Sequence, residues 1–278
     1  MLDLKFALIG VGISRSRAPE LHRLAGEHAG VRLTYDLIQL QVSDPTAFDS
    51  ALAACQAGGY RGVNVTYPFK ERAAQAVHVS SDQVRRLGAV NTLLLHVGSE
   101  PEGFNTDYTG FKRAFASRFP ARNPGVVAIV GAGGVGRAIA FGLTDLRAAE
   151  IRLFDQSIAK SHSVAAALGA QSATRVIVCA SLEEATTGAD GLINATPQGM
   201  HQYPVTPVAK QLIGGQSWAF DAVYTPTQTQ FLTHAMDAGL EVLYGYELFF
   251  FQGVGAFEIF TGLRVDQARL RQALALAA

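Results

Sequence analysis

Val126-Val-Ala-Ile-Val130-Gly131-Ala-Gly-Gly-Val-Gly136 is the stretch of this sequence that decides its expected fold. Five apolar residues, typical of a buried strand, lead directly into the pattern G-x-G-x-x-G, and a helical pattern follows at once. This glycine pattern indicates a binding site only when it follows a strand and precedes a helix, because the same glycines elsewhere indicate only a turn. It predicts a dinucleotide-binding loop, with a glycine-rich connection in some other α/β fold as the alternative.

Each glycine of the motif has a mechanical reason. Gly131 allows the tight turn off the strand, Gly133 lets the backbone approach a pyrophosphate, and Gly136 lets helix and strand pack closely. The phosphates are expected at the helix N-terminus, where unpaired N–H groups favour an anion. The predicted cofactor-binding loop consists of Gly131, Ala132, Gly133, Gly134, Val135 and Gly136.

An acidic residue follows the next apolar run, Ile151-Arg-Leu-Phe154, at position Asp155. An acid at the end of the second strand can accept hydrogen bonds from a ribose 2′-hydroxyl, and it would repel a 2′-phosphate. We therefore predict that Asp155 belongs to the cofactor site and that NAD is favoured over NADP. The alternative is a helix-capping role, because acids at strand ends also serve as caps.

Composition excludes several classes of protein. The chain has 278 residues, a formal net charge of zero, 49% hydrophobic and 17% charged residues, which is typical of a globular enzyme with room for two domains. A neutral chain gives no electrostatic footprint for nucleic acid or an anionic membrane.

The cysteines and histidines indicate no metal or redox site, and the N-terminus indicates no membrane segment. Cys55 and Cys179 form no metal or redox spacing, and no histidine pair with metal-ligand spacing appears, so no metal site is expected. The apolar run near the N-terminus is too short for a signal peptide or a spanning helix. Together these features predict a cytoplasmic protein.

The first 107 residues alternate short apolar strands with helices, which predicts α/β architecture. Strands are expected at 6–11, 33–40 and 62–65, helices at 19–29, 45–57, 70–77 and 81–87, and a hairpin over 89–95 and 103–105; Asp44 or Ser43 is the expected cap of the second helix. A connecting helix over 108–119 precedes a breaker cluster at 120–125.

The middle of the chain predicts a parallel, doubly wound sheet. Its strands are expected at 126–130, 151–155, 175–179, 191–194, 218–223 and 241–243. Helices over 246–260 and 266–277, the second capped by Asp266, then pack back on the first domain. The predicted domains are therefore 1–107 with 246–278 for the substrate, and 108–245 for the nucleotide.

Three polar clusters interrupt otherwise apolar surroundings at Asn64–Lys70, Gly88–Thr92 and Asn105–Asp107. A dehydrogenase acting on an alcohol needs a group that takes the hydroxyl proton while hydride leaves for the nicotinamide. Lys70 and Asp107 are candidates for that pair. Each also has a structural alternative, because Lys70 suits a first helical turn and Asp107 suits a helix cap.

Neutral hydrogen-bonding groups accompany this pair. Asn64, Thr66 and Asn91 would supply donors and acceptors to a polyhydroxylated substrate. Asn91 has its own structural alternative as a turn residue.

With these residues in view, the chain resembles the shikimate/quinate dehydrogenase family over its full length. The motifs that carry the resemblance are Ser16-Arg-Ala-Pro19, Asn64-Val-Thr-Tyr-Pro-Phe-Lys70, Gly88-Ala-Val-Asn-Thr92, Asn105-Thr-Asp107, Gly131-Ala-Gly-Gly-Val-Gly136, Asn194-Ala-Thr-Pro-Gln-Gly-Met200, Asp221-Ala-Val-Tyr224 and Gly245 with Gln252. Their specificity and order make a chance match negligible.

The resemblance implies reversible hydride transfer between NAD(P) and the ring 3-hydroxyl of a cyclohexene or cyclohexane carboxylate, giving the 3-dehydro ketone. It implies that Lys70 is the general acid/base and that Asp107 is its partner. The implied substrate positions are Ser16, Thr66, Asn91, Tyr224 and Gln252, to which the residue chemistry adds Asn64. The implied cofactor positions beyond the glycine loop and Asp155 are Thr196, Val223 and Gly245.

Two departures from the family pattern bear on specificity. Where the substrate-carboxylate motif usually has two hydroxyl residues, this chain has Ser16 and Ala18, and Arg15, Arg17 or water are candidates to compensate. Ala18 also leaves room near ring carbon 1, where quinate carries an extra hydroxyl. After the second nucleotide strand, Asp155-Gln-Ser replaces the basic sequence typical of NADP-dependent biosynthetic members.

The resulting hypothesis is an NAD-dependent shikimate dehydrogenase that also accepts quinate, more in keeping with quinate catabolism than with aromatic amino acid biosynthesis. Alternatives are an NADP-dependent biosynthetic enzyme, an aminoshikimate-pathway dehydrogenase and a non-catalytic NAD-binding regulator. The expected partners are small molecules only, with a monomer or homodimer as the assembly. The run Leu248-Phe-Phe-Phe251 predicts core packing, with a dimer surface as the alternative.

Overall fold

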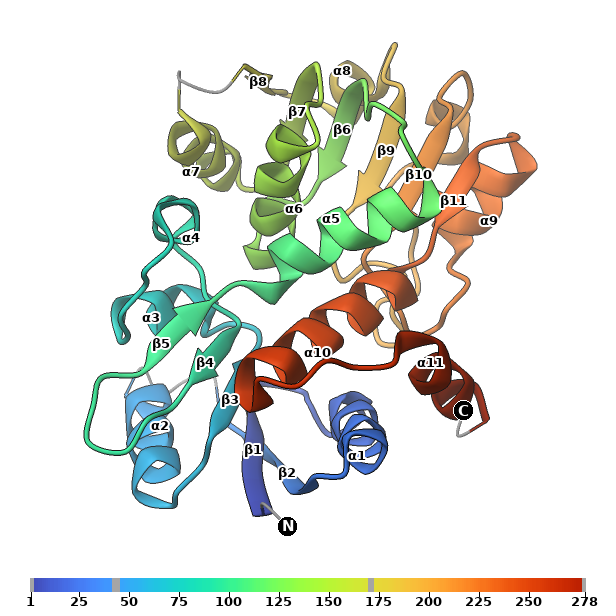
Figure 1. Ribbon diagram of the computed structural model, residues 1–278. Helices are drawn as coiled ribbons and strands as arrows, with labels where there is room; N and C mark the ends of the chain where they lie inside the picture. Colours follow the sequence, from blue (N-terminus) through green and yellow to red (C-terminus); the bar gives the residue numbers. More distant parts are fainter. Residues whose placement is uncertain (1–2, 42–45, 170–172, 277–278) are drawn as a thin grey trace. The chain divides into compact units, whose positions relative to one another are not determined.

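Two compact units, each with its own β-sheet, make up the chain in the computed structural model, which describes residues 3–41, 46–169 and 173–276 (Figure 1). The first unit contains Met1–Thr106 and Gln252–Ala278, and the second contains Asp107–Phe251. The return to the first unit falls at Gln252, inside helix α10 (Gly245–Thr261), whereas the sequence predicts it at Tyr246.

The second unit holds a six-stranded parallel sheet with the order β8-β7-β6-β9-β10-β11. This is the predicted doubly wound arrangement, in which the strand order reverses between β6 and β9 and places a ligand crevice at that point. The strands are β6 (Val126–Val130), β7 (Glu150–Phe154), β8 (Arg175–Val178), β9 (Gly191–Asn194), β10 (Trp218–Asp221) and β11 (Glu241–Leu243).

Helices cover both faces of this sheet because its strands are apolar on both sides. On one face, aromatic side chains of α5 (Thr106–Arg118) pack on β10, with Phe111 against Phe220 and Phe115 against Trp218, at ring-centroid distances of 5.3 and 5.1 Å. The opposite face carries a cluster from α8 (Leu182–Thr186) and α9 (Gln230–Asp237). The other helices of the unit are α6 (Gly134–Asp145) and α7 (Ile158–Leu168), and a 3₁₀ turn, η1, spans Lys210–Leu212.

The first unit holds a five-stranded mixed sheet with the order β2-β1-β3-β4-β5. Strands β1 (Asp3–Gly10), β2 (Arg32–Gln39) and β3 (Gly62–Val65) are parallel. Strands β4 (Thr92–Leu94) and β5 (Glu102–Phe104) form the predicted hairpin, in which β4 is antiparallel to both β3 and β5. The carboxyl ends of β3 and β5 and the amino end of β4 therefore lie at the same edge.

Side-chain alternation divides the helices of the first unit between the two faces of its sheet. Residues such as Ala7 and Val63 face a core shared with α2 (Ala47–Ala57), α3 (Lys70–Gln75) and α4 (Asp82–Leu87). Phe6 faces the other way, where Phe260 lies at a ring-centroid distance of 4.9 Å. That second face is covered by α1 (Ala18–Ala29), the latter part of α10 (Gly245–Thr261) and, over α1, α11 (Gln267–Leu276).

The structure confirms one of the predicted helix caps. Asp266 Oδ1 accepts from Arg269 N at 3.1 Å, as predicted for the cap of α11. Asp107 lies within the first turn of α5 and not at its cap position. The predicted caps Asp44 and Ser43 lie outside the described residues.

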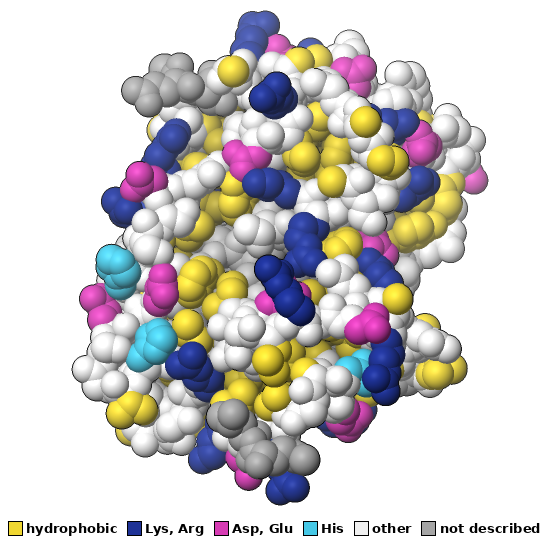
Figure 2. Space-filling model, in the orientation of Figure 1, with side chains coloured by type: hydrophobic (Ala, Val, Ile, Leu, Met, Phe, Trp, Pro, Cys, Tyr) yellow, Lys and Arg dark blue, Asp and Glu magenta, His cyan; other side chains and the backbone are white. Residues whose placement is uncertain are grey.

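The Leu248–Phe251 run of α10 is buried throughout, as core packing requires, so its apolar surface needs no dimer partner to cover it. Within the described residues, no helix is both long and apolar enough to cross a membrane. Basic and acidic side chains are interspersed on the face drawn in Figure 2, in keeping with the zero net charge.

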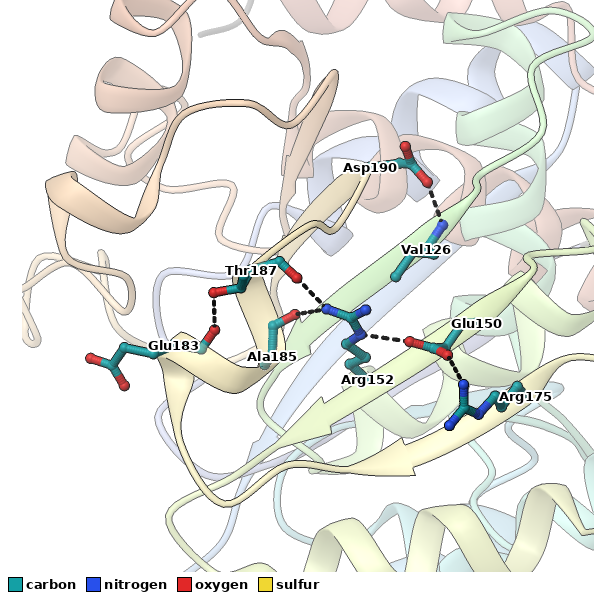
Figure 3. A network of polar contacts seen from close by, with 8 residues as sticks. All are labelled: Val126, Glu150, Arg152, Arg175, Glu183, Ala185, Thr187 and Asp190. Atoms are coloured by element: carbon teal, nitrogen blue, oxygen red, sulfur yellow. Dashed lines mark hydrogen bonds and ion pairs between the residues drawn. The ribbon is translucent and has the colours of Figure 1, made fainter.

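An ionic network closes the amino-terminal end of the second sheet (Figure 3). Glu150, at the start of β7, lies between Arg152 at 2.6 Å and Arg175 at 3.1 Å. Arg152 also donates to the Thr187 carbonyl at 2.5 Å, which ties β7 to the end of α8. Because ligands bind at the carboxyl ends of parallel strands, this network lies at the opposite end of the sheet from the expected cofactor site.

Candidate functional site

The three polar motifs of the first unit meet at one edge of its sheet. Asn64 belongs to the end of β3, Asn91 immediately precedes β4, and Thr106 follows β5. The pairing of Asn64 with Thr92 across β3 and β4, and of Thr92 with Phe104 across β4 and β5, brings them together. Residues separated by up to about forty positions thus share one small region, as the antiparallel hairpin requires.

Asn91 is the centre of this region. Its Oδ1 accepts from Thr106 N at 2.7 Å, from Thr92 Oγ1 at 3.0 Å and from Thr106 Oγ1 at 3.2 Å. Because a backbone N–H can only donate, the contact with Thr106 fixes which end of the amide is oxygen. Nδ2 is then the polar atom of this side chain that has no partner among the described residues, which suits a substrate-binding donor.

Asn64 is tied into the first unit by hydrogen bonds at both ends of its amide. Its Nδ2 donates to Asn91 O at 3.3 Å and to Thr92 Oγ1 at 3.2 Å, and its Oδ1 accepts from Tyr35 at 2.8 Å. The side chain is buried, and both ends of its amide are used inside the unit. Asn64 thus supports Asn91, and its contact with substrate stays a prediction from the sequence.

Lys70 begins α3, after a turn in which Phe69 N donates to Thr66 O at 3.0 Å. Its backbone carbonyl accepts from Val90 N at 2.9 Å, which anchors it to the residue before Asn91. The side chain is only 9% exposed, unlike the surface lysine that a first helical turn would allow. A buried ammonium at the edge where the polar motifs meet is suited to proton transfer.

Asp107 follows Thr106 directly, and its side chain is only 6% exposed. Thr106, the residue before it, is hydrogen-bonded to Asn91 and to Thr92. Asp107 itself is grouped with the second unit, and its pairing with Lys70 stays a prediction from the sequence.

Ser16 lies in the loop after β1, two residues before the start of α1. Its Oγ accepts from Ala18 N at 3.2 Å, which uses a lone pair and leaves the hydroxyl proton available to a carboxylate. Arg17 is committed elsewhere, to Glu20 at 2.9 Å and to the Leu274 carbonyl at 3.1 Å. Of the two arginines that could replace the missing hydroxyl at Ala18, Arg17 is therefore engaged in other contacts, whereas Arg15 is exposed.

The glycine loop of the second unit has the geometry that its motif requires. Gly131 has φ +102°, and a Cβ there would lie 2.8 Å from Thr196 Cγ2. A Cβ on Gly136 would lie 1.9 Å from the Gly131 carbonyl oxygen, so helix α6 approaches the strand too closely for any side chain. A Cβ on Gly133 would meet nothing within 4 Å, which leaves its surface open to a ligand.

Asp155 is tied to this loop. Its Oδ2 accepts from Ala132 N at 2.8 Å and its Oδ1 accepts from Ser157 N at 2.8 Å. The carboxylate thus caps the turn after β7 and also holds the glycine loop. The two readings of the sequence are compatible, because a carboxylate oxygen has lone pairs left for a ribose hydroxyl.

A buried cluster holds the loops after β9 and β10; its members Asn194 and Asp221 belong to sequence motifs but have no predicted role. Asp221 Oδ1 accepts from Asn194 Nδ2 at 2.8 Å and from Val223 N at 2.9 Å, while Oδ2 accepts from Thr229 Oγ1 at 2.5 Å. Burial raises the pKa of the Asp221 carboxyl to about 6, against the opposing effect of these hydrogen bonds.

The same cluster places three predicted residues. Asn194 Oδ1 accepts from Thr196 N at 2.9 Å and Thr196 Oγ1 at 2.7 Å, and Asp221 holds Val223. A Cβ on Gly245 would lie 2.4 Å from the Val223 carbonyl oxygen, so Gly245 must be glycine for close packing. All three therefore sit at the carboxyl-terminal end of the parallel sheet, where cofactors bind in this architecture.

Two remaining predicted residues lie on α10 or next to it. The Tyr224 ring stacks on Phe249, with ring centroids 4.8 Å apart and planes 14° apart. Gln252 is half-buried on α10, next to Gly253, whose Cα packs against Leu21 of α1. In the first unit, the structure brings together the predicted residues of the sheet edge. In the second unit, it brings together the glycine loop with Asp155 and, around Asp221, the residues Thr196, Val223 and Gly245.

Comparison with known proteins gives one consistent result. Residues 8–93 match the family model for the shikimate dehydrogenase substrate binding domain. The quinate/shikimate dehydrogenase (NAD(+)) of Corynebacterium efficiens is 34% identical over 97% of this chain and 96% of its own length. The shikimate dehydrogenase (NADP(+)) of Halobacterium salinarum is 36% identical over 97% of both chains.

Solved structures agree with these relatives. Quinate dehydrogenase from Corynebacterium glutamicum in complex with NAD has a TM-score of 0.87 and 31% identity, covering 99% of both chains. Shikimate 5-dehydrogenase from Thermus thermophilus in complex with NADP(H) and shikimate has a TM-score of 0.85 and 32% identity, covering 99% of this chain and 100% of that one. The full-length similarity and the shared motifs lead to one conclusion: this chain belongs to the shikimate/quinate dehydrogenase family.

Proposed function

We propose that this protein is an NAD-dependent shikimate dehydrogenase that also oxidises quinate, reversibly converting the ring 3-hydroxyl to the 3-dehydro ketone. The observation that carries the proposal is the buried Lys70, whose backbone is hydrogen-bonded to Val90, the residue before Asn91. The orientation of the Asn91 side-chain amide is fixed by Thr106 N. A polyhydroxylated ring needs neutral hydrogen-bonding groups for recognition and one ionisable group for proton transfer, and this edge of the sheet supplies both.

Lys70 is proposed as the general acid/base. Its Nζ takes the proton of the ring 3-hydroxyl during oxidation and returns it during reduction. Asp107 is the proposed partner that orients the ammonium and holds a ring hydroxyl. Asn91 Nδ2, Thr66, Gln252 and the Ser16 hydroxyl are the proposed substrate contacts, with Tyr224 directed to the substrate carboxylate.

The second unit fits a nicotinamide dinucleotide. The open surface at Gly133, the N-terminus of α6 and the Asp155 carboxylate are the features needed for a pyrophosphate and an adenosine ribose. Bound NAD supplies hydride-transfer chemistry that no amino-acid side chain provides. Thr196, Val223 and Gly245 are proposed to line the same site, because the Asp221 cluster holds the loops that carry them.

NAD is preferred to NADP in this proposal because of Asp155. Its negative charge next to the glycine loop would repel a 2′-phosphate, and the chain offers no basic residue at the two following positions, Gln156 and Ser157. The NAD(+) in the name of the Corynebacterium efficiens relative supports this preference.

Quinate is included because of Ala18. A methyl side chain at the start of α1 replaces a hydroxyl and leaves space near the ring carbon that bears quinate's additional hydroxyl. The partners are then small molecules only, the assembly a monomer or homodimer, and the compartment the cytoplasm, which the two free buried cysteines support.

A steady-state panel tests the proposal. Shikimate, quinate and an aminoshikimate analogue are each assayed with NAD and with NADP, and kcat/KM is compared across the six combinations. We expect turnover of shikimate and quinate with NAD at least about tenfold better than with NADP, since one lost charge contact is worth about 1.5–3 kcal/mol. A preference for NADP would overturn the role of Asp155, and no turnover with any pair would overturn the proposed activity.

A further inference from the structure

Behind Asn91, the first unit contains a chain of hydrogen bonds that starts at Tyr35 on the edge strand β2. Tyr35 OH donates to Asn64 Oδ1, Asn64 Nδ2 donates to Thr92 Oγ1, and Thr92 Oγ1 donates to Asn91 Oδ1, at 2.8, 3.2 and 3.0 Å. The four residues come from β2, β3 and β4 and the position just before β4, so the chain crosses one face of the sheet.

Backbone groups fix the orientation of both amides in this chain. The Asn91 carbonyl can only accept, so the Asn64 amide must turn its nitrogen toward it and its oxygen toward Tyr35. Tyr35 is therefore the donor. At the other end, the Thr106 N–H can only donate, so Asn91 must turn its oxygen inward. No amide in the chain can flip without breaking a backbone contact.

Head-to-tail hydrogen bonds polarise one another in a low-dielectric interior. Asn64, Asn91 and Thr92 are nearly fully buried, at 7%, 3% and 0% exposure. The Asn91 oxygen accepts bonds from both Thr92 and Thr106, which withdraws electron density from the amide. Its Nδ2–H groups become stronger donors as a result.

Tyr35 is itself held rigidly. Its ring packs against the imidazole of His22 at a centroid distance of 4.7 Å, and His22 in turn packs against Phe6 and Phe260. Burial lowers the pKa of His22 to about 3, so the ring facing Tyr35 is neutral. The phenol is thus fixed by aromatic contacts that do not depend on the substrate.

We propose that Tyr35, Asn64 and Thr92 are positioning residues that fix Asn91 as a hydrogen-bond donor to a substrate ring hydroxyl. This inference rests on the proposed function, because it assigns the substrate group that Asn91 meets. Tyr35 does not touch the substrate; it acts through Asn64 and Thr92. No motif includes Tyr35, which lies 29 positions from Asn64 in the chain.

Tyr35→Phe tests the start of the chain, because it removes one hydroxyl and keeps the ring against His22. We expect KM for shikimate to rise about three- to tenfold and KM for NAD to stay unchanged. The melting temperature should fall by only about 2–4 °C, since a single net hydrogen bond is lost. The matched control is Tyr60→Phe, which removes another tyrosine hydroxyl of the same unit, bonded to Asp36 at 2.5 Å on the surface. It should leave both KM values unchanged.

Thr92 tests the link next to Asn91. Thr92→Val removes the hydroxyl that Asn91 accepts from, and KM for shikimate should rise by about tenfold. Thr92→Ser keeps that hydroxyl and should restore KM close to the unaltered value. If both variants raise KM equally, the hydroxyl is not what matters and the positioning role is wrong.

Shikimate analogues that each lack one ring hydroxyl complete the test. For the analogue missing the hydroxyl that Asn91 meets, Tyr35→Phe should no longer alter KM, because the contact it weakens is absent. An unchanged KM for shikimate in Tyr35→Phe, or an equal effect with every analogue, would overturn the positioning role alone. No turnover by the unaltered protein would overturn the proposed function and this role with it.

Discussion

The two units of this protein build their candidate sites by opposite means. In the first unit, the edge of the sheet is filled with side chains that bond to one another, and Asn91 is held by Thr92 and Thr106. In the second unit, the essential residues of the loop are glycines, and a side chain at Gly136 would collide with the backbone. The first site is built from hydrogen-bonding side chains, and the second requires positions that have no side chain.

The difference follows from what each unit is proposed to bind. A ring with several hydroxyls is recognised by groups of defined donor and acceptor direction, which only side chains can place around it. A pyrophosphate is recognised by backbone N–H groups at a helix N-terminus. The ligand can reach these groups only where no side chain covers the backbone. The second unit uses two carboxylates, Asp155 and Asp221, to hold its backbone loops in place.

Lys70→Ala should have the largest effect and should separate the two units functionally. We expect kcat for shikimate oxidation to fall about 10³-fold, as for loss of a general acid/base, while the dissociation constant for NAD is unchanged. Stopped-flow or steady-state rates and fluorescence titration of NAD measure the two quantities. Lys5→Ala, an exposed lysine of the same unit, is the control. Normal turnover by Lys70→Ala would show that another group transfers the proton.

Gly136→Ala and Gly133→Ala form a pair that tests the backbone nature of the second site. A methyl at Gly136 meets the Gly131 carbonyl oxygen at 1.9 Å, and we expect a loss of about 3 kcal/mol in unfolding free energy. A methyl at Gly133 meets nothing in the protein, so stability should be unchanged. NAD affinity should nevertheless fall about tenfold, because the methyl lies where the pyrophosphate approaches.

Chemical denaturation and NAD titration of both variants give the readout. If Gly133→Ala binds NAD normally, the cofactor does not approach the loop at that point. Equal destabilisation by the two substitutions would contradict the difference in packing between the two glycines.

Asp221→Asn tests the carboxylate that holds the loops after β9 and β10. The folded pKa of about 6 lies above the unfolded value of 3.8, so the protonated acid is favoured by folding. Its contribution to stability is fully present below about pH 3.8 and is lost as pH rises through 6, with a span on the order of 3 kcal/mol. Asparagine keeps the acceptor for Val223 and cannot ionise.

The difference in unfolding free energy between Asp221→Asn and the unaltered protein is measured from pH 4 to pH 8. It should grow in favour of the variant as the pH rises across this window and then level off. A difference that does not vary with pH would mean that Asp221 does not titrate with a raised pKa.

Asp155→Asn should have the smallest effect and tests the other carboxylate. The variant keeps one amide oxygen for the Ala132 or Ser157 N–H but loses the charge, so KM for NAD should rise about tenfold. KM for NADP should fall or stay constant, because the repulsion of the 2′-phosphate is removed. An unchanged ratio of the two values would show that Asp155 only caps the turn.

Much of the fold was readable from local pattern. The apolar runs at Val126–Val130 and Gly191–Asn194 appear as strands with the predicted bounds, and the hairpin of β4 and β5 is present. These signals are local, because burial on both faces gives continuous apolar runs and a hairpin needs only a short connection. The switch between units within α10 was not readable, since a helix periodicity continues through Phe251 and Gln252 without a break.

The candidate site was readable only in part. Lys70 and Asn91 could be named because short motifs surround them, whereas Tyr35 and Thr229 stand outside any motif and enter through contacts across the sheet or between loops. Asn64 was placed correctly at the sheet edge, but the sequence could not show that its amide is used up by Tyr35 and Thr92. Hydrogen-bond partners distant in sequence leave no periodic signal.

The sequence by itself determined the order of strand, glycine loop, helix and acid, the polar motifs and the family, because these depend on residue identity at short spacing. Only the tertiary structure decided which polar groups face each other. It turned the Asn91 amide outward as a donor, joined the Asp155 carboxylate to the glycine loop and buried Asp221 among three donors. The physical reason is that the direction of a hydrogen bond and the solvent exposure of a charge belong to the assembled sheet and its loops, and no stretch of chain carries them alone.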